Sequence, residues 1–322
     1  MTSTAVATIL NGLVPVVFAM GLGWLAGRLG YMRAEAVEVL ATFVLHFGLP
    51  AALFLVAATT PPDRLVDPAF VATLTVGMVA TFVLALLLGL AGFRHGLRPA
   101  AVQALACAFP DMAFFGAPVL AAVIGPEGYI SVLVGNLVVG LLLLPATVML
   151  LRFGEDRGGD DHGSAADGLA ALLTRGVRHA AAHPLLWMPA LGVALSFLDV
   201  SLPTSLRGAV DLVGRSTGGL SLFALGLMFC GARVRLDGEI AANIALKTLV
   251  QPALMALGAA LLGLSGPLAA QAIITGALPT AMIPALLAVQ HDAYADKAPA
   301  TVLATTLVAV VTVSLVIALV VP

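Results

Sequence analysis

Charged residues are scarce in this chain. They make up 10% of its 322 residues, whereas hydrophobic residues make up 61%, and the mean hydropathy is +1.08. A soluble domain carries about 25% charged and 45–50% apolar residues. So little charge cannot cover the surface of a water-soluble enzyme, so we expect a membrane protein. The net charge of −2 points to no particular soluble partner.

Motifs of several common site types are also missing. Cys107 and Cys230 both lie in apolar segments and form neither a disulfide framework nor a metal-binding spacing. The chain has no phosphate-binding Gly-Lys-Ser loop and no His-Glu-x-x-His zinc pair. We therefore expect no enzyme, no metal and no cofactor, and ATP-driven transport by this chain is excluded. No basic cluster with interleaved aromatic residues predicts a nucleic-acid partner.

The apolar residues fall into about ten blocks, most of which have the length that spans a bilayer. Their limits are 6–27, 36–58, 69–92, 99–124, 128–151, 184–200, 205–231, 240–263, 268–290 and 297–320. No charge precedes Arg28, so the first block is expected to be a retained helix and not a secretory signal.

Basic residues predict the orientation of these blocks in the membrane. With the N-terminus outside, the external loops hold Arg64 and Arg207. The cytoplasmic loops then hold Arg28, Arg33, Arg94, Arg98, Arg152, Arg157, Arg175, Arg178, Arg233, Arg235 and Lys297. By the positive-inside rule, this asymmetry predicts a multi-pass protein of the inner (plasma) membrane with both termini outside the cytoplasm.

A polar stretch divides the chain into two halves of five blocks each. Residues 1–151 form the first predicted repeat, 152–183 a cytoplasmic linker and 184–322 the second repeat. An odd number of spans per half places the halves in opposite orientations. The predicted fold is an all-α membrane protein with ten transmembrane helices in a five-plus-five inverted repeat.

Paired prolines interrupt one block in each half. Pro110 and Pro118 lie in the fourth block, and Pro279 and Pro284 lie in the ninth. Proline lacks an N–H donor and clashes with the preceding helical turn, so we expect both helices to break there. In oppositely oriented halves, the two breaks should meet as an antiparallel crossing. Half-helices that begin at such a crossing point their N–H groups into the gap, which favours an anion-binding site, although packed structural kinks are the alternative.

The first interrupted segment resembles a motif of the auxin efflux carrier family, which reads Pro-Asn-Thr-x-x-x-Gly-x-Pro. Pro110, Gly116 and Pro118 match this pattern. Asp111 stands where the family usually has Asn, and Met112 where it often has Thr. The second segment is similar to the family's Leu-Pro-x-x-x-x-Pro, matched by residues 278–284. The family includes plant PIN carriers and bacterial malate and malonate permeases.

The resemblance implies a fold shared with bile-acid symporters and sodium–proton antiporters. It implies a scaffold made of residues 6–58 and 184–231, and a transport domain made of residues 69–151 and 240–320. In an elevator-type cycle the transport domain moves against the scaffold. The substrates implied are small organic anions, usually carboxylates.

Two residues, Asp111 at the crossing and His46 in the second block, are candidates for proton coupling. A carboxylate at the bilayer centre costs about 2.5–3.5 kcal/mol on insertion scales, so Asp111 is expected to have a function. Proton carriage is one role, and capping of the second half-helix is the alternative. Thr280 holds the corresponding position in the other half, and His46, one turn before Pro50, could share proton traffic.

Two cations and one amide complete the predicted binding site. Arg215 lies inside the seventh block and Lys247 inside the eighth, and each could pair with a substrate carboxylate or with Asp111. The alternatives are that Arg215 pairs with Asp211, four residues earlier, and that Lys247 extends to the membrane interface. Asn136 supplies a neutral donor, or bonds only to a neighbouring helix.

The sequence therefore predicts a secondary active transporter of a small carboxylate, with a malonate-like dicarboxylate favoured and a proton as coupling ion. The gradient of the substrate itself is the other possible driving force. Three alternatives stay open: a sodium-coupled carboxylate symporter, an auxin-like monocarboxylate efflux carrier, and a membrane-embedded anion sensor that does not transport. The oligomeric state, including a homodimer, is not determined by the sequence.

Overall fold

The computed structural model describes residues 3–33, 35–60, 67–155, 184–230 and 236–321. Within these ranges all regular secondary structure is helical, apart from an isolated antiparallel bridge between Pro110 and Thr280. Most of the predicted linker lies outside the described residues. So do Arg64, Arg157, Arg175, Arg178, Arg233 and Arg235 of the orientation argument.

The predicted blocks coincide with the observed helices. In the first half these are α1 (Ser3–Arg28), α2 (Glu35–Phe43), η1 (Val44–Gly48), α3 (Leu49–Thr59), α5 (Pro68–Leu87), η2 (Leu88–Gly92), α6 (Leu97–Ala108), η3 (Met112–Gly116), α7 (Ala117–Val123), η4 (Pro126–Gly128), α8 (Tyr129–Val138), η5 (Val139–Leu143) and α9 (Leu144–Glu155). In the second half they are α11 (Pro184–Phe197), α12 (Thr204–Met228), α13 (Gly238–Ala245), η7 (Leu246–Val250), α14 (Gln251–Leu261), α15 (Gly266–Ala277), α16 (Ile283–Gln290) and α17 (Lys297–Val320).

Five helical stretches are long and apolar enough to cross a membrane by themselves: Glu35–Thr59, Pro68–Gly92, Pro126–Gly154, Gly238–Leu261 and Lys297–Val320. Shorter apolar helices cover Val14–Arg28, Met112–Val123 and Trp187–Phe197. Helix α12 carries charged residues along its first half and is not among the five. The chain is an all-helical, polytopic membrane protein.

Several prolines lie in helices that continue past them. Four of them each follow a π-helical turn (η1, η3, η5 or η7) by two residues, namely Pro50, Pro118, Pro145 and Pro252. Proline cannot donate to the carbonyl four residues earlier and its ring crowds that carbonyl. A π-helical turn widens the helix at that point, which absorbs the clash and keeps the helix continuous.

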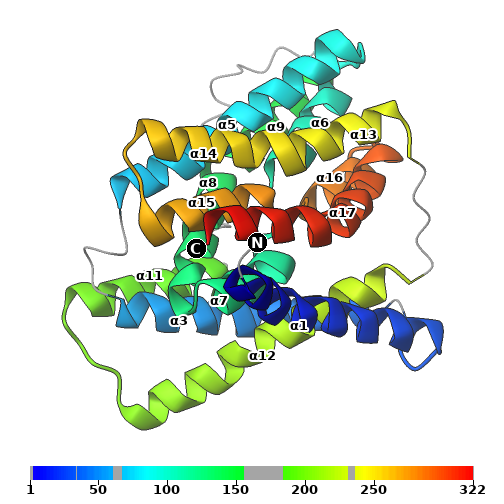
Figure 1. Cartoon of the computed structure of the whole chain (residues 1–322). Helices are drawn as coiled ribbons and strands as arrows, with labels where there is room; N and C mark the ends of the chain where they lie inside the picture. Colours follow the sequence, from blue (N-terminus) through cyan, green and yellow to red (C-terminus); the bar gives the residue numbers. More distant parts are fainter. Residues whose placement is uncertain (1–2, 34, 61–66, 156–183, 231–235, 322) are drawn as a thin grey trace.

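The helices form two groups that Figure 1 shows one above the other. In the lower group, α12 packs against α1 and α3, and α3 packs against α11. In the upper group, α14 packs between α5 and α15, α6 packs against α5 and α9, and α15 packs against α17. Helix α7 contacts α1 and α12 of the lower group, and α8 contacts α3.

Glycines bring α1 and α12 into backbone contact. A Cβ atom at Gly226 would lie 1.9 Å from the carbonyl oxygen of Met20, and one at Gly23 would lie 2.0 Å from that of Phe223. Small residues at helix interfaces are the usual route to close packing in membranes. The α1–α12 pair is therefore held by direct backbone packing.

Candidate functional site

The two proline-interrupted segments meet as an antiparallel crossing, as predicted. Helix α6 ends at Ala108 and α15 ends at Ala277. The Asp111 N–H donates to the Pro279 carbonyl oxygen at 2.7 Å, and the Ala281 N–H donates to the Phe109 oxygen at 3.0 Å. These two hydrogen bonds satisfy backbone groups that neither helix can use, which membrane burial requires.

The four prolines have different roles. Pro110 and Pro279 lie where the helices are interrupted. Pro284 lies in the first turn of α16, which has no use for the missing N–H and accepts the fixed backbone angle of proline. Pro118 follows the π-helical turn η3 by two residues, inside the half-helix that begins at Met112. Both helices break as expected, and each break lies at the first proline of the pair.

Gly116 allows the two segments to touch. A Cβ atom there would lie 2.6 Å from Leu278 Cδ1 and 2.9 Å from the carbonyl oxygen of Asp111. The Gly116 N–H donates to that same oxygen at 2.8 Å. A glycine at this position is therefore explained by packing at the crossing. Met112, one residue after Asp111, is buried as well.

Asp111 is 3% exposed and caps the half-helix that follows it. Its Oδ1 accepts a hydrogen bond from the Phe114 N–H at 3.1 Å. An N-terminal cap satisfies one of the donors that a helix start leaves unpaired. The capping interpretation of Asp111 is thus present in the geometry, and it leaves room for the proton-carrying one.

Thr280, the counterpart of Asp111, ties the second break to two other helices. Its hydroxyl donates to the Ala106 carbonyl oxygen on α6 at 2.8 Å. Its N–H donates to Thr305 Oγ1 on α17 at 3.2 Å. The two halves of the crossing therefore differ chemically, with an acidic cap on one side and a hydroxyl bridge on the other.

Lys247 and Gln251 join the last turns of α6 and α15. Lys247 is fully buried and donates from Nζ to Gln251 Oε1 and to the Gly276 carbonyl oxygen, the latter at 3.3 Å. Gln251 Nε2 donates to the Ala108 carbonyl oxygen at 2.9 Å. A cation near two helix C-termini interacts favourably with both helix dipoles. Lys247 thus points to the crossing and does not extend to the membrane interface.

Neutral polar side chains form a second layer around the crossing. On one side, Asn243 accepts from Gln103 Nε2 at 2.8 Å and donates to the Tyr294 hydroxyl at 2.9 Å. On the other side, Ser131 donates to Gln271 Oε1 at 2.8 Å. The half-buried Asn136 has a buried Nδ2 that lacks a hydrogen-bond partner within the described residues.

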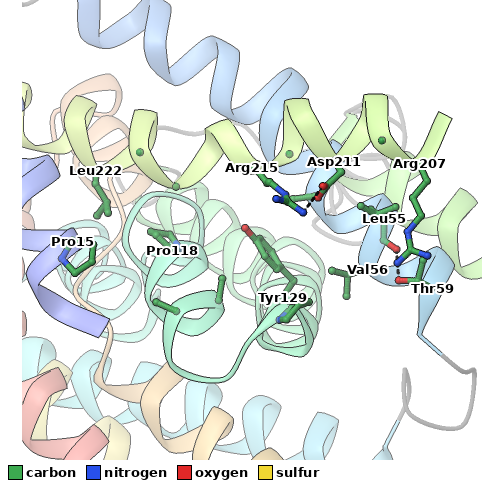
Figure 2. A pocket seen from close by; sticks show the side chains of 18 of the residues that line it. Pro15, Leu55, Val56, Thr59, Pro118, Tyr129, Arg207, Asp211, Arg215 and Leu222 are labelled. Atoms are coloured by element: carbon green, nitrogen blue, oxygen red, sulfur yellow. Dashed lines mark hydrogen bonds and ion pairs between the residues drawn. The ribbon is translucent and has the colours of Figure 1, made fainter. Parts of the chain in front are cut away.

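A cavity of about 800 Å³ lies beside the crossing. Its walls come from α1, α3 and α12 on one side, and from α7, η4 and the start of α8 on the other. Figure 2 shows Asp211 and Arg215 side by side on α12, with the Tyr129 hydroxyl pointing towards that helix. Arg215 Nη2 and Asp211 Oδ2 are 2.6 Å apart, and the Arg215 side chain is 79% exposed.

The cavity collects two of the predicted site residues, Arg215 and Pro118. The other predicted residues are absent from its lining: Pro110, Asp111, Met112, Gly116, Asn136, Lys247, Pro279, Thr280, Pro284 and His46. Most of these lie at the crossing behind the cavity wall, where Ser221 of α12 donates to the Phe114 carbonyl oxygen at 3.0 Å. The predicted site residues thus lie in two neighbouring places, the polar crossing and the adjoining cavity.

His46 is not among the residues that line the cavity. It lies on η1 with an exposed side chain whose Nδ1 is 3.1 Å from the Thr42 carbonyl oxygen. The geometry thus gives His46 a bond within its own helix, and its part in proton traffic stays a prediction.

Sequence reasoning missed several polar residues of the cavity, among them Arg207 and Tyr129. Arg207 precedes Asp211 by four residues, as Asp211 precedes Arg215, so helical spacing along one face was a usable signal. Tyr129 follows the Pro126–Gly128 turn and gave no such signal, because its position depends on how α8 packs against α3.

Comparison with known proteins shows which family this chain belongs to. The sequence profile of the family described as membrane transport protein matches residues 8–317. The chain belongs to this family, which contains the auxin efflux carriers. The family's motif positions Pro110, Gly116 and Pro118 therefore lie in this carrier at the crossing, and Asp111 departs from the family's usual Asn at its acidic cap.

Individual relatives of this carrier agree with the assignment. The chain is 28% identical to the "Putative malonate transporter" of Rhizobium meliloti over 309 residues, 95% of this chain and 94% of that protein. It is 26% identical to the "Uncharacterized transporter YfdV" of Escherichia coli over 307 residues, 94% of this chain and 95% of that protein. A rice protein, "Probable auxin efflux carrier component 5a", is 30% identical over 107 residues, 31% of this chain and 28% of that protein.

One hydrolase-like pattern in this carrier has a structural explanation. Residues 214–218 read Gly-Arg-Ser-Thr-Gly, which fits the Gly-x-Ser-x-Gly pattern. That motif requires a sharp turn between a strand and a helix. Here the residues lie inside the continuous helix α12, and Ser216 Oγ donates to the Val213 carbonyl oxygen at 2.7 Å. The pattern therefore forms no nucleophile elbow.

Proposed function

We propose that this carrier is a secondary active transporter of small carboxylates, with a malonate-like dicarboxylate as the favoured substrate. The observation that carries the proposal is the placement of the Arg215 guanidinium in a cavity whose opposite wall includes Pro118, on the half-helix beyond the first break, and Tyr129. Guanidinium groups bind carboxylates through two parallel hydrogen bonds.

A dicarboxylate suits this pairing of features because it carries two separated negative charges. One carboxylate would bind Arg215, and the other would accept from the Tyr129 hydroxyl on the opposite wall. The printed name of the Rhizobium meliloti relative supports malonate as the first substrate to test. Tyr129 and Thr59 add hydroxyl groups to the same lining.

The transport cycle that we propose is of the elevator type. The lower helix group would be the scaffold (residues 6–58 and 184–231), and the upper group would be the transport domain (residues 69–151 and 240–320). The cavity has walls from both groups, since α1, α3 and α12 face α7 and α8 across it. Substrate bound there would touch both moving parts. A five-plus-five inverted repeat with both termini outside the cytoplasm is the topology that goes with this proposal.

Proton coupling through Asp111 is the second part of the proposal. Asp111 is a buried carboxyl group at the crossing, and the hydrogen bond from the Phe114 N–H holds its side chain in place. Protonated Asp presents the same donor and acceptor groups as the Asn that is usual in the family. Asp111 can therefore cap the half-helix in either protonation state.

Uptake of labelled malonate by proteoliposomes tests this function. The proposal expects saturable uptake by the wild-type protein that unlabelled malonate inhibits. An Arg215→Gln variant should take up malonate with a KM raised about tenfold or more, the loss expected for one charge-assisted hydrogen-bonded contact. Saturable binding in detergent without uptake would favour an anion sensor.

A further inference from the structure

Asp211 and Arg215 form an ion pair four residues apart on α12, and both residues line the cavity. Asp211 therefore places a carboxylate on the same guanidinium that the proposed substrate needs. We propose that Asp211 is a resident competitor for Arg215, and that a substrate carboxylate takes its place when it binds. This inference rests on the proposed function and assigns Asp211 a role in setting affinity and anion selectivity.

The pair is weak enough to exchange. The Arg215 side chain is 79% exposed and that of Asp211 is 33% exposed, so water and salt screen their attraction. Exposed ion pairs of this kind contribute little to stability. A free carboxylate can approach the planar guanidinium in the two-bond geometry, which a carboxylate fixed on the same helix cannot choose freely. Substrate can therefore replace Asp211 at small cost.

Arg207 gives the displaced carboxylate a second partner. It lies four residues before Asp211 on the same helix and lines the same cavity. In Figure 2 its guanidinium extends towards Thr59, so it would have to change rotamer to meet Asp211. An acidic residue that precedes its basic partner by four residues is the more favourable order. The pair with Arg215 is accordingly the resting one. The pair with Arg207 becomes available when Arg215 binds substrate.

The charges of the lining suit an anion that brings more than one negative charge. Within the described residues, the charged side chains of the lining are Arg207, Asp211 and Arg215. Two guanidinium groups and one carboxylate leave a net charge of +1. Asp211 lowers the positive potential of the cavity, so a monoanion gains less from entering than a dianion does. Asp211 thereby contributes to the preference for dicarboxylates.

Glycines on the same helix leave space for the exchange. Gly208 and Gly219 line the cavity, and a Cβ atom at either would meet no atom within 4 Å. Gly218 approaches the crossing more closely, because a Cβ atom there would lie 3.4 Å from Pro118 Cβ. Gly214 packs against α3, since a Cβ atom there would lie 3.1 Å from Ala52 Cα. The open space around Arg215 therefore lies at Gly208 and Gly219, about two turns before it and one turn after it.

Malonate uptake by proteoliposomes containing Asp211→Asn tests the inference. The variant should lower the KM for malonate by about two- to fivefold, the range that corresponds to an exposed ion pair. Asp211→Ala should shift the KM in the same direction. In an Arg215→Gln background, Asp211→Asn should have a clearly smaller effect, because the contested guanidinium is gone.

Asp199→Asn is the matched control. Asp199 lies at the turn between α11 and α12, outside the lining of this cavity, and its positive φ of 52° is one that Asn tolerates well. Its KM should equal that of the wild type. An unchanged or raised KM for Asp211→Asn overturns the inference and leaves the transport function intact. A wild-type protein without any carboxylate uptake overturns both.

Discussion

The backbone N–H of Asp111 donates to the carbonyl oxygen of Pro279, 2.7 Å away, and so joins the two interrupted helices at their breaks. This bond satisfies two backbone groups at once. The Asp111 N–H lies beyond the end of α6 and the Pro279 carbonyl beyond the end of α15, and both residues are buried where water cannot satisfy them. The side chain of Asp111 stays available as a cap and, in our proposal, as a proton carrier.

Replacement of Asp111 by asparagine separates these two roles. The substitution is not expected to unfold the protein, because an amide oxygen can still accept from the Phe114 N–H. Asp111→Asn should therefore retain malonate binding and thermal stability but lose the pH dependence of uptake. The measurement is initial uptake at an acidic and at an alkaline external pH.

The control for Asp111 is Asp111→Ala, which removes the cap as well as the acid. Loss of an N-terminal cap costs about 0.5–2 kcal/mol, so this variant should also unfold at a lower temperature. Wild-type pH dependence in Asp111→Asn would show that the coupling proton, if there is one, is held elsewhere.

Lys247→Met should damage both stability and transport. Methionine has a similar length but leaves the Gly276 carbonyl and Gln251 Oε1 without their buried donor. An unsatisfied buried group of this kind costs about 1–3 kcal/mol. We expect a lower Tm and at least a tenfold loss of malonate uptake, measured by thermal unfolding in detergent and by proteoliposome flux.

The control for Lys247 is Gln251→Leu, which removes the bond to Ala108 and one acceptor of Lys247 but keeps the ammonium and its bond to the Gly276 carbonyl oxygen. It should destabilise the protein to a similar extent while retaining more transport. If Lys247→Met has the Tm and the malonate uptake of the wild type, Lys247 contributes to neither stability nor transport, and the prediction is wrong.

The backbone contact between α1 and α12 predicts a sharp position effect. Gly226→Ala places a methyl group 1.9 Å from the Met20 carbonyl oxygen, which forces the helices apart. Overpacking of this kind costs about 1–3 kcal/mol. Gly219→Ala on the same helix meets no atom within 4 Å and serves as control. Thermal unfolding should distinguish the two variants, and equal Tm values would contradict the observed packing.

A pH effect on stability is expected outside the membrane-spanning segments, at Asp237. Its carboxylate accepts from Lys297 Nζ and caps α13 through Ile240 N–H at 2.9 Å. The hydrogen bond from Lys297 holds the pKa of Asp237 below its ordinary value. A carboxyl group with a lowered folded-state pKa stabilises the fold above its unfolded-state pKa of about 3.9, and this contribution is lost as pH falls through the folded-state value.

The Tm of Asp237→Asn should accordingly approach that of the wild type at the acidic end and fall below it near neutral pH. Thermal unfolding across this pH range is the measurement. Asp296→Asn, next to Lys297 in sequence, is the control that should leave the difference between acidic and neutral pH in place. An Asp237→Asn protein as stable as the wild type near neutral pH would contradict the prediction.

Much of this fold follows from local chemistry, and much of the site does not. The breaks at Pro110 and Pro279 were predictable because proline cannot continue a helix whose backbone must bond internally. The different role of Pro118 was not, because it depends on the π-helical turn η3, which lets the half-helix from Met112 continue past this proline. The burial of Lys247 depends on which face of the α13–α14 helix packs against α6 and α15, and the spacing of its polar residues leaves that face undecided. The cavity around Arg215 depends on how α12 tilts between α1 and α3.

Malonate flux through wild-type proteoliposomes and their Arg215→Gln counterpart tests the central claim most directly. Acetate, with one carboxylate, is the comparison substrate. The account predicts saturable malonate uptake by the wild-type protein, and a rise in KM for malonate in the variant that exceeds the rise for acetate. Absence of saturable uptake of either anion by correctly folded wild-type protein, or equal KM values in the two proteins, would contradict it.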